Sequence, residues 1–179
     1  MQHLPHGVAL PAGASTEAIC LAEEQLGITL PAALQEFYLT HNGTGTAFFY
    51  PVNSTRHSHR IYAIEAAISA YGIWATLRNG LEDERRRLGT PSIPEASWWK
   101  NDWLPMTANR GPDGIFVDLS SDLYGQVCQV TNCCTAGINV EILANDCRAW
   151  LDQLACRLLS GQCKFGSPCP TLSSGPLWQ

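Results

Sequence analysis

The chain has 179 residues, of which 45% are hydrophobic and 15% are charged, and its formal net charge at pH 7 is −5. This length suits one folded domain with a sizeable core. The acidic balance argues against nucleic-acid binding, because neutralising phosphates requires a surplus of lysine and arginine. A basic protein partner fits the net charge better.

Targeting and redox features indicate a cytoplasmic protein. No apolar run approaches the roughly 18 residues that a membrane span requires, and Met1–His6 lacks the basic and apolar regions of a secretion signal. We therefore expect no membrane association. In a reducing compartment the 8 cysteines should remain thiols, and Cys128, Cys147 and Cys156 are expected in the core on a predicted strand and helix.

The first third of the chain predicts an extended arm, two helices and a strand. Residues 1–14 contain several prolines and glycines and should be extended. Apolar spacing and a Ser/Thr cap predict a first helix over Thr16–Leu26. Pro31 is suited to open a second helix, which should end at Asn42-Gly43. Residues 44–52 have the composition of a strand.

Two groups of potential metal ligands are not expected to form a metal site. His57 and His59 can reach one ion, but no further ligand lies nearby, so a solvated loop over residues 53–60 is favoured. The remaining thiols lack the two-residue gap of zinc ligands. They are Cys133, Cys134, Cys163 and Cys169. We therefore expect neither a metal nor another cofactor.

A long charged helix is predicted next. Apolar residues at helical spacing indicate a helix from about Glu65, with an interruption expected at Gly80. Within Glu82–Arg87 the acids precede the arginines, an order that suits a helix ending near Gly89. The arginine triplet there is interpreted as a solvated helical face rather than a nucleic-acid patch.

The stretch Asn101–Val130 predicts the middle of an antiparallel sheet. Pro112-Asp113-Gly114 is a turn sequence, and two strands should flank it. After the turn, alternation places two sets of residues on opposite faces. One set is Ile115, Val117 and Leu119, and the other is Phe116 and Asp118. Just upstream, Trp98, Trp99 and Trp103 form a cluster that suits either a core or a recognition surface.

The last part of the chain predicts a strand, a helix and a tail. Ile138, Val140 and Ile142 alternate with polar residues, as in a half-buried strand. Asn145 is expected to cap a final helix that ends at Gly161. Residues 162–179 lack periodicity and are interpreted as a C-terminal tail.

The order of these elements resembles the SUKH superfamily, of the Smi/Knr type, over about residues 15–161. The entry of that family has a leucine-glycine helix end, a leucine-proline helix start and an asparagine-glycine stop. These are matched by Leu26-Gly27, Leu30-Pro31 and Asn42-Gly43. A second block is matched by Trp103-Leu104-Pro105, Asp113-Gly114, Asp118-Leu119, Gly125-Gln126-Val127 and Trp150-Leu151.

The resemblance implies a single α+β domain in which a curved antiparallel sheet is covered by helices, with a helical insertion at about 65–89. It also implies binding without catalysis. Bacterial members are similar to immunity proteins, which bind and neutralise toxins of polymorphic, contact-dependent or type VI secretion systems. Fungal members are cell-wall regulators, so a scaffold or regulator that binds cellular partners is the alternative function.

Acidic and aromatic residues are the candidate contacts for a basic partner, because they stand at hairpin ends or on the polar face of a strand. They are Asp113, Asp118, Asp122, Glu141 and Trp99. Asp113 is also explained by its turn, and Asp118 by a bond to a neighbouring loop. The sequence leaves the oligomeric state open.

An enzyme with a cysteine nucleophile is the competing hypothesis, with His41, His57 or His59 as the base. Such chemistry requires a base within hydrogen-bond reach of the thiol and a group that orients the base. The sequence carries no known hydrolase or phosphate-binding motif, so a non-catalytic protein is favoured.

Overall fold

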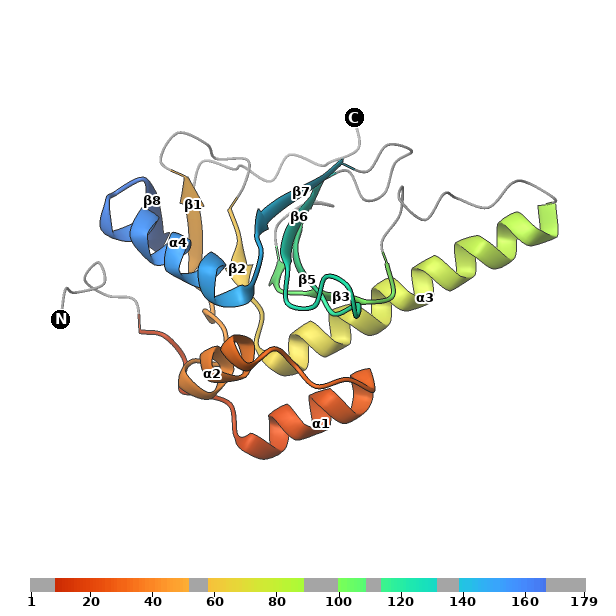
Figure 1. Cartoon of the computed structure of the whole chain (residues 1–179), viewed down its shortest axis with the longest axis horizontal. Coiled ribbons are helices and arrows are strands. Elements are labelled where there is room, and N and C mark those ends of the chain that lie inside the picture. Colours follow the sequence, from red (N-terminus) through yellow and green to blue (C-terminus); the bar gives the residue numbers. More distant parts are fainter. Residues whose placement is uncertain (1–8, 52–57, 89–99, 109–113, 132–138, 167–179) are drawn as a thin grey trace.

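The computed structural model describes residues 9–51, 58–88, 100–108, 114–131 and 139–166. Within them, four helices and eight strands form an α+β fold whose strand pairs are all antiparallel (Figure 1). The predicted fold class is therefore confirmed. None of the described helices combines the length and the apolar character that crossing a membrane requires.

The helices begin and end where local chemistry favours it. They are α1 (Thr16–Leu26), α2 (Ala32–Thr40), α3 (Ile64–Leu88) and α4 (Cys147–Leu159). In α1 the cap Ser15 accepts a hydrogen bond from the Ala18 amide, and Gly27 ends the helix with φ 69°. The predicted bounds of α1 are confirmed. The cap of α4 is Asp146 rather than Asn145, because the Asp146 carboxylate accepts from the Ala149 amide.

The strands follow one another around a curved surface. They are β1 (Phe48–Pro51), β2 (Arg60–Ile61), β3 (Trp103–Pro105), β4 (Thr107–Ala108), β5 (Gly114–Asp118), β6 (Val127–Thr131), β7 (Asn139–Ala144) and β8 (Cys163–Gly166). Four of them form the sheet β3-β5-β6-β7, and the others pair as β1-β8 and β2-β4. A bridge between Phe49 and His59 joins β1 to the residue before β2. A bond from the Met106 amide to the Ile115 carbonyl joins the β3–β4 segment to β5.

The central strand β5 is buried on both faces. Ile115, Val117 and Leu119 belong to the main core, which also contains residues of α1, α2 and α4. Phe116 lies on the opposite face with Trp103 and Cys128, where residues of α3 cover it. The predicted division of this strand into two faces is confirmed. The polar face expected at Asp118 is instead packed beneath a helix.

Three expectations about elements are wrong. Helix α3 continues through Gly80 as one helix of 25 residues, because a single glycine costs a helix only about 1 kcal/mol. The expected tail contains β8, which pairs with β1 and buries Phe165. Cys156 is exposed, whereas Cys128 and Cys147 are buried as expected.

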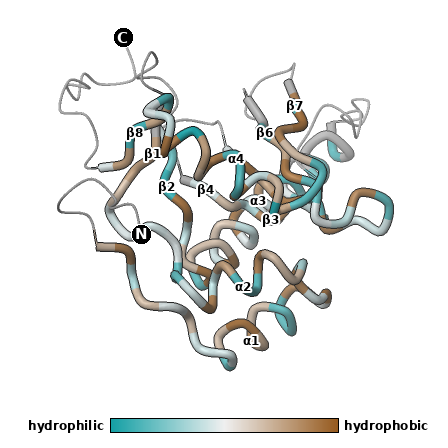
Figure 2. Tube along the Cα trace, turned by 60° about the vertical axis from the view of Figure 1, so that its left-hand side comes forward, coloured by the Kyte–Doolittle hydropathy of each residue, from teal (hydrophilic) through white to brown (hydrophobic). Residues whose placement is uncertain are grey.

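The strand β7 presents apolar side chains to solvent. The exposed fractions of Val140 and Ile142 are 40% and 59%, so the side of the strand that was expected to face the core faces outward. Leu143 is half-buried and Ala144 is buried. Figure 2 shows the hydrophobic character of β7 beside β6. In the described part of the chain β7 is thus an edge strand with an exposed apolar face.

A concave pocket as the candidate functional site

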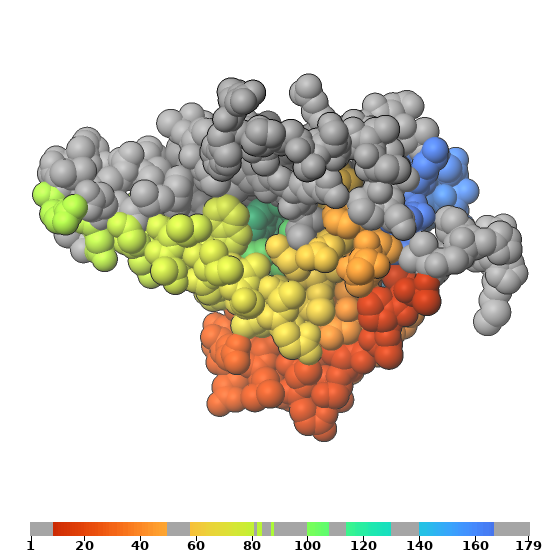
Figure 3. Space-filling model, turned by 180° about the vertical axis from the view of Figure 1, so that it is seen from behind, coloured from red at the N-terminus to blue at the C-terminus, as the bar shows by residue number. Residues whose placement is uncertain are grey.

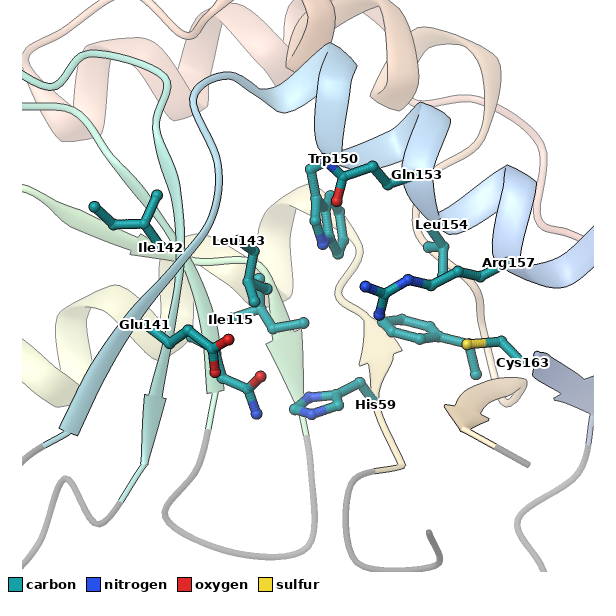
Figure 4. A pocket seen from close by; sticks show the side chains of 12 residues that line it. His59, Ile115, Glu141, Ile142, Leu143, Trp150, Gln153, Leu154, Arg157 and Cys163 are labelled. Atoms are coloured by element: carbon teal, nitrogen blue, oxygen red, sulfur yellow. The ribbon is translucent and has the colours of Figure 1, made fainter. Parts of the chain in front are cut away.

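A pocket of about 420 Å³ lies between the strands and α4. Its walls come from both ends of the curved surface, because β7 contributes Glu141 and β8 contributes Cys163 (Figure 4). The helix α4 supplies Trp150 and Arg157. Segments far apart in the sequence therefore meet in one concavity.

Aromatic rings form a fixed part of the pocket wall. The rings of Phe49 and His59 are stacked with centroids 5.8 Å apart, and Trp150 meets Phe49 edge-on at 6.3 Å. His59 is buried, and its Nδ1 is hydrogen-bonded to Thr107 Oγ1 at 3.0 Å. The same Oγ1 accepts from the Ile115 amide at 3.0 Å. Because both ends of this network are attached to strands, the ring of His59 is held in place.

Two opposite charges stand at different walls of the pocket. Glu141 comes from β7 and Arg157 from α4, and both residues are exposed (Figure 4). Between them the pocket has aromatic and aliphatic walls. Such a combination of an apolar interior with a few polar groups is typical of binding sites. The pocket therefore suits a group with an apolar stem and a polar end.

The thiol in this pocket is not activated. Burial raises the pKa of Cys163, and the nearby Arg157 only partly opposes this effect. A catalytic cysteine requires the reverse, a lowered pKa that yields the thiolate near neutral pH. The structure does bring Cys163 and His59 to one pocket.

The predicted acids do not form one surface. Glu141 lies beside Gln129, which is paired with Ile115 near the start of β5. Asp122 follows the other end of β5 and is exposed, with its Oδ1 accepting from Ser121. Of the two, only Glu141 lines the pocket. Asp113 and Trp99 lie outside the described residues.

Asp118 is a structural residue and not an exposed acid. Its exposed fraction is 3%. The carboxylate accepts hydrogen bonds from Trp103 Nε1 at 2.9 Å and from the amide and hydroxyl of Ser120 at 2.9 and 2.5 Å. A buried carboxylate needs such partners. The placement of Asp118 on a partner-facing surface was therefore wrong, because α3 covers that face.

Several pocket residues escaped sequence reasoning. Phe49 and Trp150 were expected only as strand and core residues, and Arg157 received no role. His59 was considered as a metal ligand or a base in a solvated loop, yet it is buried. Among the described residues, no group of three His, Cys, Asp or Glu side chains could hold a metal ion. The pocket arises from tertiary contacts, for which the local pattern gives no signal.

Together, the curved antiparallel sheet, its helical cover and the aromatic pocket define an α+β domain with a concave face. Residues 13–153 match the family model of SMI1 / KNR4 (SUKH-1). The chain therefore belongs to the SMI1 / KNR4 family, and the resemblance to the SUKH superfamily is confirmed. The matched range extends from just before α1 into α4. No curated protein matches the chain.

Proposed function

We propose that this protein is an immunity protein that binds and neutralises a cognate bacterial toxin in the cytoplasm of the cell that makes both. The toxin would be an effector of a polymorphic, contact-dependent or type VI secretion system. Membership of the SUKH-1 family supports this function. The concave pocket beside an exposed edge strand is the observation that supports a binding face at this position.

The strand β7 is the proposed centre of the contact. Val140 and Ile142 offer exposed apolar surface, and Glu141 lies between them in the sequence. Protein interfaces commonly combine an apolar centre with charges that select and steer the partner. Because the chain carries a formal net charge of −5, the partner should be basic. A lysine or arginine of the toxin could enter the pocket and approach Glu141.

Co-expression with the product of a neighbouring toxin gene tests the function. The expected result is that this protein restores growth of cells that make the toxin, and that the two proteins purify together. If growth is not restored and no complex is recovered, the protein does not confer immunity to that toxin.

A matched pair of charge reversals tests the binding face. Glu141→Lys should weaken binding at least about tenfold, which corresponds to about 1.4 kcal/mol. Asp122→Lys changes the net charge equally but lies beyond the other end of β5, so binding should change little. Calorimetry with the purified toxin measures both. The opposite ranking of the two variants would move the interface away from the pocket.

A further inference from the structure

The wall that α4 contributes to the pocket carries hydrogen-bond donors. The α4 residues that line the pocket are Trp150, Gln153, Leu154 and Arg157. Their spacing of three and four positions places them on one side of the helix. The side chains of Trp150 and Arg157 have hydrogen-bond donors and no acceptor. One side of α4 therefore presents donors to whatever group occupies the pocket.

The indole N–H of Trp150 has no hydrogen-bond partner in the part of the chain that the structure describes. The residue is only 5% exposed, and Figure 4 shows its nitrogen directed into the pocket. A buried donor that faces a purely apolar group loses the hydrogen bond that water would provide. A group that fills this part of the pocket must therefore carry an acceptor.

Arg157 adds a positive charge beside this donor. It lies in the last turn of α4 and is exposed. Within the described ranges it forms no ion pair. Figure 4 shows its guanidinium directed over the same pocket as the Trp150 nitrogen. A guanidinium can bind both oxygens of a carboxylate at once, so the acceptor that suits this wall best is a carboxylate.

The remaining walls of the pocket define the rest of the ligand. Phe49, Ile115 and Leu154 provide apolar surface. Of the described residues that line the pocket, Glu141 is the only carboxylate, and it comes from β7 rather than from α4. A doubly charged anion such as phosphate would be repelled by Glu141 and would leave the apolar walls uncovered. A single carboxylate on an apolar group satisfies both the donors and these walls.

We propose that the pocket binds a carboxylate attached to an apolar group, and that Arg157 and the indole N–H of Trp150 hold the carboxylate. The apolar group lies against Phe49 and Leu154. The carboxylate belongs either to a free organic acid or to an acidic residue of the toxin, and this second source rests on the proposed function. The cation proposed for Glu141 and this carboxylate occupy opposite walls of the pocket.

A second pocket has the opposite charge and serves as an internal control. Its volume is about 680 Å³, and it lies between α1 and α3. Figure 3 shows these two helices side by side on one face of the molecule. Of the described residues that line this pocket, Glu65 alone is charged, and it is exposed. A carboxylate should therefore bind in the pocket beside α4 and not between α1 and α3.

NMR titration of the full chain with three small compounds tests the proposal. Phenylacetate, phenylacetamide and phenethylamine are similar in size but carry a negative, a neutral and a positive polar end. Phenylacetate should bind in the low-millimolar range expected of so small a ligand and shift the indole N–H signal of Trp150. The other two compounds should bind beside α4 at least about tenfold more weakly. Equal binding of phenylacetamide, or no binding of phenylacetate, would overturn the proposal.

A matched pair of arginine variants tests the residue that holds the carboxylate. Arg157→Gln should weaken phenylacetate binding at least about tenfold. Arg148→Gln removes the same charge from the same helix, but Arg148 pairs with Glu36 and does not line the pocket, so binding should be unchanged. Glu141→Gln should tighten binding because it removes a negative charge. Equal weakening by the two arginine variants, or weakening by Glu141→Gln, would contradict the assignment. Far-UV circular dichroism checks that each variant keeps the fold.

Competition with the purified toxin distinguishes the two sources of the carboxylate. If an acidic residue of the toxin fills the pocket, the toxin should displace phenylacetate, and Arg157→Gln should weaken toxin binding. If phenylacetate remains bound in the complex, the ligand is a free organic acid. The titration and the growth test of immunity are independent measurements, so failure of one is distinguishable from failure of the other.

Discussion

A carboxylate inside a sheet is stable only when hydrogen-bond donors surround it, and Asp118 meets this condition through Trp103 and Ser120. The strands β3 and β5 are paired through their backbones. The hydrogen bond from the Trp103 indole to Asp118 adds a side-chain link between the same two strands. Lys100 lies over the indole ring of Trp103, with Nζ 5.5 Å from the centre of the ring. Asp118 therefore organises one end of the central strands.

Replacing Asp118 should be costly for this reason. Asp118→Ala leaves the Trp103 indole and both donors of Ser120 without an acceptor, and we expect the free energy of unfolding to fall by about 2–4 kcal/mol. Urea denaturation measures the change. Asp122→Ala, at an exposed acid four residues further on, should stay within about 0.5 kcal/mol of wild type. A similar loss in both variants would show that the buried bonds contribute little.

For single residues, the sequence predicts which face of a strand a side chain occupies better than it predicts whether that side chain is exposed to solvent. The two-residue period correctly placed Ile115 and Phe116 on opposite sides of one strand. It could not show that both sides are covered, because Trp74 reaches Phe116 from a helix about forty positions earlier. The same limitation explains why Asp118 was expected at the surface.

At the scale of elements, the Asn42-Gly43 pair connects two helices. It follows α2, and the Asn42 side chain accepts a hydrogen bond from the Ile64 amide at 2.8 Å, at the start of α3. Gly43 has φ 79°, and a Cβ at this position would lie 2.6 Å from the carbonyl oxygen of Tyr62. The chain passes here only because the residue has no side chain.

Two glycine substitutions separate backbone strain from this close approach. Gly43→Ala should lower the free energy of unfolding by about 3 kcal/mol or more, because a clash adds to the cost of positive φ. Gly27→Ala has a similar φ of 69° but no atom within 4 Å of the new Cβ. Its cost should be only about 1–2 kcal/mol. Thermal or urea denaturation gives both values, and equal losses would indicate that the approach to Tyr62 relaxes easily.

Elements with strong local signals were predicted well, and those that depend on distant partners were not. Helix α1 has a cap, a periodic stripe and a glycine stop, and its bounds were correct. The strand β8 is four residues long and lies among residues without periodicity. Its strand conformation comes from pairing with β1, more than a hundred positions earlier.

At the scale of the whole molecule, buried thiols make stability sensitive to alkaline pH. Burial, with a smaller effect of the Asp118 charge, raises the pKa of Cys128 to about 12. Burial, with a smaller effect of Asp146, likewise raises the pKa of Cys147 to about 12. Burial also raises the pKa of Tyr38 above its ordinary value. The folded protein therefore keeps protons that the unfolded chain releases.

Stability should consequently decline above about pH 9. In the unfolded chain these thiols ionise near pH 9, so the stabilising effect is complete below that pH and is lost as pH rises toward 12. Each thiol contributes a slope of about 1.4 kcal/mol per pH unit over this window. Urea unfolding between about pH 8 and about pH 11 measures it. A Cys147→Ala variant should show a shallower decline, and an unchanged slope would assign the effect to other groups.

The family and the α+β class were predictable because many weak signals agree in order along the chain. The pocket was not, since its walls combine residues of β1, β7, β8 and α4. Of the predicted partner-binding residues that the structure describes, only Glu141 lies there. The sequence analysis of single residues therefore identified one acid of the pocket, Glu141, and none of its aromatic residues as pocket residues.

The pairing of β8 with β1 also has a consequence for synthesis. Phe48 pairs with Gly166, so the two strands of this ladder, which are far apart in the sequence, are made far apart in time on the ribosome. The strands β5, β6 and β7 are joined in sequence order and should form first, since short loops close at lower entropic cost than long ones. The β1–β8 ladder can close only after residue 166 has emerged from the ribosome. A nascent chain that has not reached β8 therefore lacks the wall of the pocket that contains Cys163, and binding through that pocket would begin only after β8 has been made.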